Sequence, residues 1–152
     1  MLDVSMIRGP IVPDTPEVAA DRAAVCRLPQ LYALGIDRRD EAMVLSVFAP
    51  DAVLRGALGE AVAREYVPKL VAAVAGYEAT MHNITNQYAI VEGDEAAVWS
   101  YAVALHFEPP DSGRADLALG VQYRDQLRRT DRGWLVTARE TERLWTRGPS
   151  RQ

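Results

Sequence analysis

The C-terminal half of this chain contains three long stretches with the composition of β-strands, and this feature most restricts the fold. They cover residues 96–107, 115–129 and 134–145, and turn-forming segments at 108–113 and 130–133 separate them. Globular strands usually have about 5–6 residues, and strands much longer than that must bend. The pattern therefore predicts a long antiparallel meander with a concave face.

The N-terminal half has helical rather than strand periodicity. Apolar residues follow helical spacing over 17–35, 41–48 and 63–75, and shorter strands are expected at 52–55, 77–86 and 87–91. Pro29 predicts a kink, or two helices that meet there, and Pro68 is tolerable only near the start of its helix. Helices followed by antiparallel strands predict the α+β class, with the helices on one face of a curved sheet and closing a pocket.

The length of the chain and the spacing of its prolines predict one domain. Pro10, Pro13 and Pro16 block helix and strand pairing near the start, so residues 1–16 are expected to form a flexible arm. The domain then covers 17–146, and a polar tail follows at 147–152.

The composition argues against several classes of protein. Basic residues are scattered and the net charge is −4, which argues against a nucleic-acid partner, and no apolar run is long enough to cross a membrane. A single cysteine, Cys26, excludes an internal disulfide framework, and no signal peptide is visible. With no metal-ligand spacing and no phosphate-binding loop, we expect a cytoplasmic protein without a metal or cofactor that acts on a small molecule.

The two histidines of the chain, His82 and His106, are the candidates for proton transfer. Strand alternation carries both toward a shared interior, and Asp37, after the first helix, is an acid that can orient one of them. His106 shares its strand face with two small alanines, which suits a pocket wall, but solvent exposure is the alternative. For Asp37 and His82 the alternatives are a turn residue and a packed strand residue.

Further candidates for contact with a substrate are Tyr32, Trp99, Tyr101, Tyr123 and Arg128. For the aromatic residues, packing in the core or between subunits is an equally open reading. Arg128 and Arg129 alternate on a strand, so one is expected on the concave face and the other in solvent.

The order of several short motifs over residues 17–146 resembles the SnoaL-like branch of the nuclear-transport-factor-2-like superfamily. The motifs are Tyr32…Asp37-Arg38-Arg39-Asp40, Phe48-Ala49-Pro50-Asp51-Ala52-Val53, Thr80-Met81-His82-Asn83, Val91-Glu92-Gly93-Asp94-Glu95-Ala96, and Tyr123-Arg124-Asp125…Gly133-Trp134. The resemblance implies a cone-shaped α+β barrel with a strongly curved mixed or antiparallel sheet. It implies less about function, because this fold hosts many activities.

Two enzyme groups of that superfamily are most similar, the dehydrochlorinase-like and the scytalone-dehydratase-like enzymes. The resemblance implies a dyad of Asp37 and His82 and, from the second group, a role for His106. The chain departs from both groups in the residues that would polarise a substrate. It has Tyr32 where the first group has lysine, Ile36 where the second has tyrosine, and no second tyrosine near Gly56.

Three hypotheses follow from these observations. The first is a cofactor-independent lyase, a dehydratase or related β-elimination enzyme, that acts on a small apolar hydroxyl or carbonyl compound. The second is an isomerase or polyketide-cyclase-like enzyme that uses the same base and returns the proton to carbon. The third is a module that binds a small ligand without catalysis. An epoxide hydrolase is less favoured because no Asp-Arg-Asp arrangement is evident.

In every case aromatic residues on the long strands predict a homo-oligomer, a dimer or a trimer.

Overall fold

The computed structural model describes residues 1–149. Its helices are η1 (Val4–Met6), α1 (Pro16–Arg38), α2 (Glu41–Leu45), α3 (Ala63–Val74) and η2 (Pro110–Ser112). Its strands are β1 (Phe48–Gly56), β2 (Gly59–Val62), β3 (Ala79–Glu92), β4 (Glu95–Phe107), β5 (Leu117–Thr130) and β6 (Gly133–Arg147). Within the described residues, no helix combines the length and the apolar character that crossing a membrane requires.

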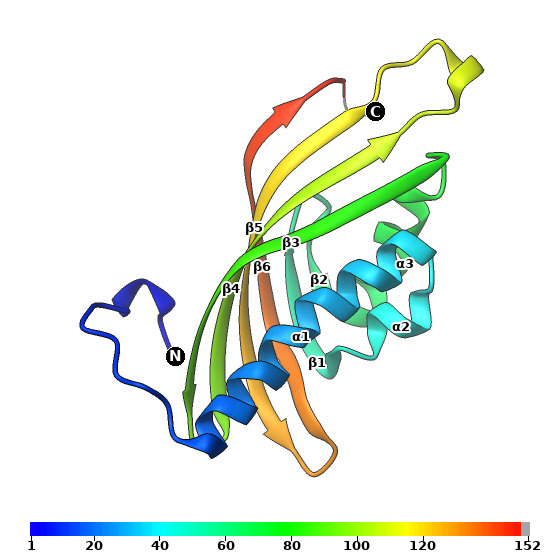
Figure 1. The fold of residues 1–152 in the computed structure, drawn as a ribbon. Coiled ribbons are helices and arrows are strands. Elements are labelled where there is room, and N and C mark those ends of the chain that lie inside the picture. Colours follow the sequence, from blue (N-terminus) through cyan, green and yellow to red (C-terminus); the bar gives the residue numbers. More distant parts are fainter. Residues whose placement is uncertain (150–152) are drawn as a thin grey trace.

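The six strands form one curved, open sheet in the order β2-β1-β6-β5-β4-β3. Neighbouring strands are antiparallel except β1 and β6, which are parallel, so the sheet is mixed. The three α-helices lie together on one face of the sheet, as Figure 1 shows. The predicted α+β class with helices gathered on one face of a strongly curved sheet is confirmed.

The first helix is longer than predicted. It is one continuous helix with a buried Pro29 inside it, and it ends at Arg38 rather than near Gly35. A Cβ atom at Gly35 would lie 2.7 Å from Cγ2 of Val44, so the glycine lets α2 pack closely on α1. The close contact between the two helices therefore explains why a glycine stands inside α1 at position 35.

Several strand and helix boundaries also differ from the prediction. Phe48 begins β1 instead of ending α2, β2 was not predicted, and Pro68 lies in the middle of α3. The predicted strands 77–86 and 87–91 are replaced by the single strand β3, which begins at Ala79 and whose pairing with β4 shifts between Ile84 and Gln87. At that irregularity the inward positions change from even-numbered residues (up to Ile84) to odd-numbered ones (from Gln87), so one long strand has the pattern of two in the sequence.

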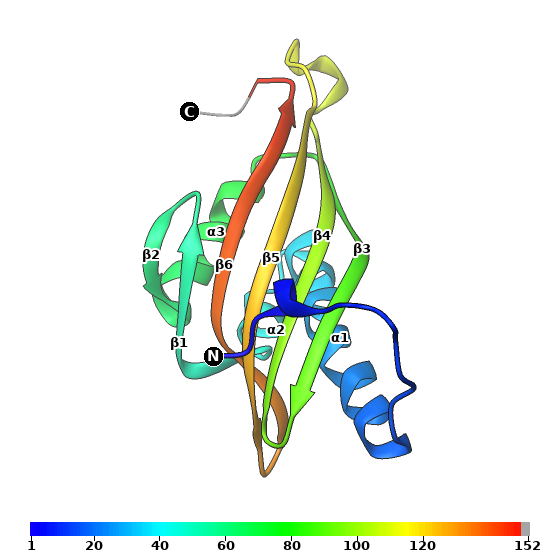
Figure 2. The same ribbon diagram turned by 90° about the vertical axis from the view of Figure 1, so that its left-hand side faces the viewer.

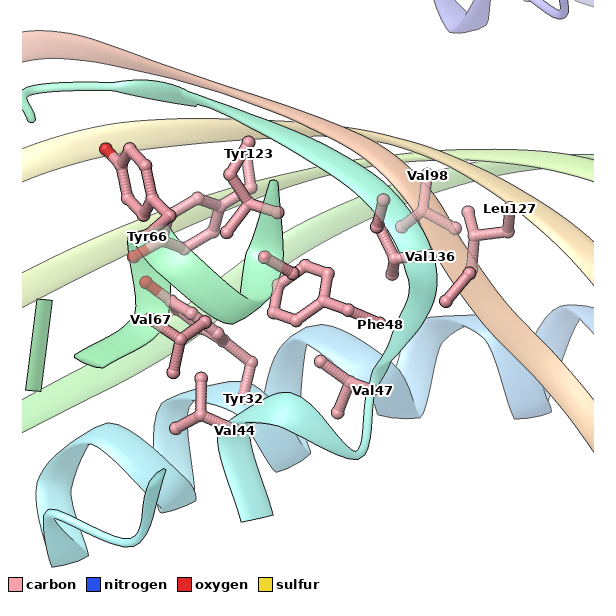
Figure 3. Close-up of a cluster of buried hydrophobic side chains, with 14 of the residues drawn as sticks. Tyr32, Val44, Val47, Phe48, Tyr66, Val67, Val98, Tyr123, Leu127 and Val136 are labelled. Atoms are coloured by element: carbon pink, nitrogen blue, oxygen red, sulfur yellow. The ribbon is translucent and has the colours of Figure 1, made fainter. Parts of the chain in front are cut away.

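The core fills the space between the helices and the inner face of the sheet. Figure 3 shows Tyr32, Phe48, Tyr66 and Tyr123 converging there, and smaller aliphatic side chains from the sheet and α2 surround them. Tyr32 makes edge-on contacts with Phe48 and Tyr123, at ring-centroid distances of 6.2 and 5.5 Å. The aromatic residues thus join α1 to the centre of the sheet.

The N-terminal segment lies against the opposite, outer face of the sheet, where Figure 2 shows η1 in front of the central strands. Val4 is buried there, and the Gln126 side chain donates a hydrogen bond to the Leu2 carbonyl at 2.9 Å. The first residues of the predicted arm are therefore bound to the outer face of the sheet. Of the predicted tail 147–152, residues 150–152 lie outside the described residues.

Candidate active site

Asp37, in the last turn of α1, meets His82 of β3. His82 Nδ1 lies 2.7 Å from Asp37 Oδ1, and the His82 backbone N–H donates to Asp37 Oδ2 at 2.9 Å. The Thr80 hydroxyl donates to Asp37 Oδ1, also at 2.9 Å. Three donors from two positions on one strand face therefore hold a single carboxylate. We refer to Asp37 and His82 as the dyad.

The environment keeps Asp37 in its charged form. Burial alone would raise the pKa of this carboxyl, but hydrogen bonds from the His82 ring and backbone and from Thr80 outweigh it and lower the pKa below the ordinary value of 3.8. Asp37 is thus a carboxylate at neutral pH and can only accept hydrogen bonds.

The charge on Asp37 determines the tautomer of His82. Because Asp37 accepts at Nδ1, that nitrogen carries the proton and Nε2 keeps its lone pair. The His82 side chain is 8% exposed, against 24% for Asp37. The arrangement is that of an oriented imidazole base with a carboxylate to stabilise the imidazolium that forms when the base takes a proton.

His106 of β4 lies next to the dyad. Its ring centroid is 5.6 Å from that of His82 in an edge-on arrangement, and the Tyr77 ring lies 4.9 Å away. His106 is 6% exposed, and its buried Nδ1 has no hydrogen-bond partner within the described part of the chain. Burial, followed by the proximity of His82, lowers the pKa of His106 below 6.5, so its ring is neutral at pH 7.

A second polar group lies deeper, between α1 and the sheet. Asp125 of β5 and Arg139 of β6 form a buried ion pair with two contacts of 2.6 Å. The Arg139 guanidinium carbon lies 4.2 Å from the Tyr32 ring centroid, 4.6 Å from that of Tyr123 and 5.4 Å from that of Phe48. We call these five residues the Arg139 cluster. Arg139 Nη1 is buried and, among the described residues, has no acceptor.

The charges and rings of the Arg139 cluster affect one another. Burial opposes the charge of Arg139, but the neighbouring Asp125 carboxylate and its hydrogen bonds raise the guanidinium pKa above its ordinary value. Burial also raises the pKa of the Tyr32 and Tyr123 phenols, which therefore stay protonated. Tyr32 precedes Asp37 by five residues on α1, so the cluster and the dyad are about 7–8 Å apart along the helix axis.

The structure brings only part of the predicted set together. Asp37, His82 and His106 converge, and Tyr32 and Tyr123 lie in the Arg139 cluster. Trp99 and Tyr101 have the opposite strand parity to His106 and point to the outer face of β4, away from the dyad.

Arg128 and Arg129 are both exposed at the end of β5, and they alternate between its two faces as expected. Arg129 pairs in register with Trp134, whose ring belongs to the core, so Arg129 lies on the face that the helices cover and Arg128 on the outer face. Arg128 pairs with Asp51 at 2.9 Å, while Arg129 binds Asp21 and Asp94. The pairing of β5 with β6 shifts between Gln126 and Leu127, but the extra residue lies in β6, so the alternation along β5 is kept.

Four residues at or near the site were not among the predicted site residues. The sequence does indicate Thr80, because Thr80 precedes His82 by two residues and therefore lies on the same face of the strand. The sequence also indicates Asp125 and Arg139, because each is a charged residue at an inward position of a long strand. Their pairing with each other is known only from the register of β5 and β6. No sequence pattern indicates Tyr77, because it lies in the turn before β3.

Comparison with known proteins places the chain in a family. The profile of the SnoaL-like domain matches residues 17–140. A solved structure from Novosphingobium aromaticivorans, described as a candidate aromatic ring hydroxylase, is 27% identical, with a TM-score of 0.77 over 90% of this chain and 96% of that one. No curated protein matches the chain.

Two further solved structures share the fold at lower identity. One is described as a candidate scytalone dehydratase from N. aromaticivorans, with 21% identity and a TM-score of 0.77 over 89% of this chain and 91% of that one. The other is a hexachlorocyclohexane dehydrochlorinase, LinA type 2, with 20% identity and a TM-score of 0.75 over 88% of this chain and 91% of that one.

Proposed function

The chain belongs to the SnoaL-like family, and from this premise we propose that it is a cofactor-independent lyase whose base is the Asp37–His82 dyad. The substrate is a small, mostly apolar molecule with a leaving group β to an acidic C–H bond, such as a β-hydroxy ketone. The observation that carries the proposal is the set of three hydrogen bonds on Asp37, because it leaves His82 Nε2 as an oriented acceptor.

In the proposed reaction, His82 Nε2 takes the proton from carbon and the C–H electron pair forms the new double bond. The bond from carbon to the leaving hydroxyl breaks, and the hydroxyl departs as water after it receives the proton back from His82. Asp37 stabilises the transient imidazolium, and the dyad returns to its starting state. General acid–base help of this kind contributes roughly 10²- to 10⁴-fold to the rate.

His106 serves this reaction as a neutral hydrogen-bonding group. Its unpartnered Nδ1 and its position beside His82 suit contact with the substrate oxygen on which charge develops. A buried polar atom without a partner costs free energy, and a substrate oxygen or a water would satisfy it.

The test is a screen for elimination, followed by variants of the site. Cyclic β-hydroxy ketones and chlorinated cyclohexanes are incubated with the protein, and the new double bond is followed by ultraviolet absorbance and product mass. For any substrate that reacts, Asp37→Asn and His82→Ala should lower kcat by at least about 10²-fold with the fold intact by circular dichroism. Turnover that survives both substitutions would rule out the dyad as the base.

Proton exchange separates this reaction from isomerisation. In deuterium oxide a lyase of this type releases product without the abstracted hydrogen, whereas an isomerase returns a hydrogen or deuterium to carbon. An isomerised product without loss of water would show that the dyad is the base of an isomerase rather than of a lyase.

A further inference from the structure

Arg39, at the C-terminus of α1, has an unusual backbone conformation. Its φ of 54° and ψ of 33° lie in the left-handed region, and no other non-glycine residue within 1–149 has a positive φ. This conformation favours glycine, because a side chain meets the adjacent carbonyl oxygen. A non-glycine residue persists there when the surrounding structure compensates for the strain.

The Arg39 side chain supplies that compensation. Nη1 donates to the Asp37 carbonyl at 2.9 Å, and Nη2 donates to the carbonyls of Tyr77 at 3.0 Å and Val74 at 3.4 Å. Val74 is the last residue of α3, and Tyr77 lies in the turn that leads into β3. One half-buried guanidinium therefore satisfies carbonyls at the ends of two helices and joins the helices there.

The segments that Arg39 joins carry the groups of the site. Asp37 lies two residues before Arg39 on α1. On the other side, the Tyr77 ring packs against His106, and the turn continues into β3, which supplies Thr80 and His82. The distance between the end of α1 and the start of β3 decides whether three donors can reach one carboxylate.

We propose that Arg39 is a positioning residue that keeps Asp37 in register with Thr80 and His82. This inference rests on the proposed function for its effect on catalysis, but its effect on Asp37 is independent of any substrate. Without the guanidinium, the end of α1 and the turn before β3 separate, and the hydrogen bonds on Asp37 lengthen. The pKa of Asp37 then rises, because those bonds hold it low.

Two substitutions separate the side chain from the backbone strain. Arg39→Gly removes the guanidinium and relieves the left-handed conformation, while Arg39→Lys keeps the charge but not the forked donor that reaches three carbonyls. Arg38→Ala is the matched control, because it removes an arginine from the adjacent, exposed position. Thermal unfolding of each variant confirms that it is folded.

The readouts are the Asp37 pKa from carboxyl ¹³C NMR, the His82 tautomer from ring ¹⁵N shifts, and kcat with KM for a substrate from the elimination screen. In Arg39→Gly we expect a higher Asp37 pKa and a kcat lower by about 10- to 100-fold with KM nearly unchanged, because small displacements of a catalytic group have costs of this size. Arg39→Lys should recover part of both effects, and Arg38→Ala should match the wild type.

The outcomes distinguish the two proposals. A folded Arg39→Gly protein with the wild-type Asp37 pKa would overturn the positioning role, whatever its activity. A raised Asp37 pKa in Arg39→Gly, combined with full turnover in Asp37→Asn, would leave the positioning role in place and overturn the lyase mechanism.

Discussion

The Asp125 carboxylate holds the Arg139 guanidinium by two parallel contacts of 2.6 Å, and both side chains are almost completely removed from solvent. Three aromatic rings surround the guanidinium, so few other groups near it could stabilise its charge. Breaking such a pair from one side leaves an uncompensated charge in the interior, which is costly even when the intact pair itself adds little to stability.

Asp125→Asn should therefore destabilise the protein by about 3–5 kcal/mol, measured by urea unfolding. A double variant, Asp125→Leu with Arg139→Met, should recover most of this loss because no buried charge remains. Glu142→Gln removes the partner of Arg124 from an exposed ion pair and should cost less than about 1 kcal/mol. An equal loss in Asp125→Asn and Glu142→Gln would contradict the assigned burial of the Asp125–Arg139 pair.

Thr80→Val removes one of the three donors to Asp37 and should raise the Asp37 pKa, as measured by carboxyl ¹³C NMR. In the wild type the lowered Asp37 pKa contributes stability that is complete above the unfolded value of 3.8 and is lost as pH falls through the folded pKa. The variant should show a smaller contribution. Thr85→Val, which loses an exposed hydroxyl bonded to the Tyr101 carbonyl, should leave the Asp37 pKa unchanged.

The buried His106 should make the protein less stable in mild acid. Its folded pKa lies below 6.5, so as pH falls below that value the unfolded chain binds a proton before the folded one does. The contribution of His106 is thus complete above pH 6.5 and declines as pH falls toward the folded pKa. Urea unfolding between pH 8 and pH 5 should show this decline in the wild type and a flatter profile in His106→Asn. An unchanged slope would contradict the lowered pKa.

Gly35→Ala tests the close approach of α1 and α2. In an exposed helix interior this change stabilises by about 0.5–1 kcal/mol, but here the new Cβ would lie 2.7 Å from Val44 Cγ2 and 3.0 Å from the Val44 backbone nitrogen. The steric cost should prevail, with a net loss of about 1–3 kcal/mol in urea unfolding. Gly9→Ala meets no atom within 4 Å and should be nearly neutral. Stabilisation by Gly35→Ala would show that α2 moves away without cost.

The outer face of the sheet should mediate self-association. Its exposed apolar residues on β3 and β4 are Met81, Tyr88, Tyr101 and Phe107. Exposed aromatic residues gathered on one sheet face are typical of an interface, and we propose a dimer or trimer formed through it. Light scattering after size exclusion should show an oligomer that Tyr101→Asp dissociates. Leu34→Asp, at a similarly exposed position on α1, should leave it intact. A wild-type monomer at micromolar concentration would contradict the proposal.

Local periodicity predicted most of the elements in their order, though not β2, and it predicted the direction of the key side chains. Alternation along the long strands predicted His82 and His106 on one face, because successive side chains of a strand point to opposite sides. The same alternation puts Trp99 and Tyr101 on the outer face, so the substrate contact that was predicted for them does not follow from it. Helical spacing predicted α1, and Asp37 follows from its position near the end of that helix.

The tertiary structure decided the contacts that depend on register between distant segments. The parallel pairing of β1 with β6, the irregularity after Ile84 and the pairing of Asp125 with Arg139 involve residues whose partners are far away in sequence. The roles of Gly35 and Arg39 likewise depend on which helix end packs beside α1. Sequence alone determined how side chains alternate within each regular stretch, because backbone geometry is local. Folding decided which faces meet, because packing and strand register are properties of the whole chain.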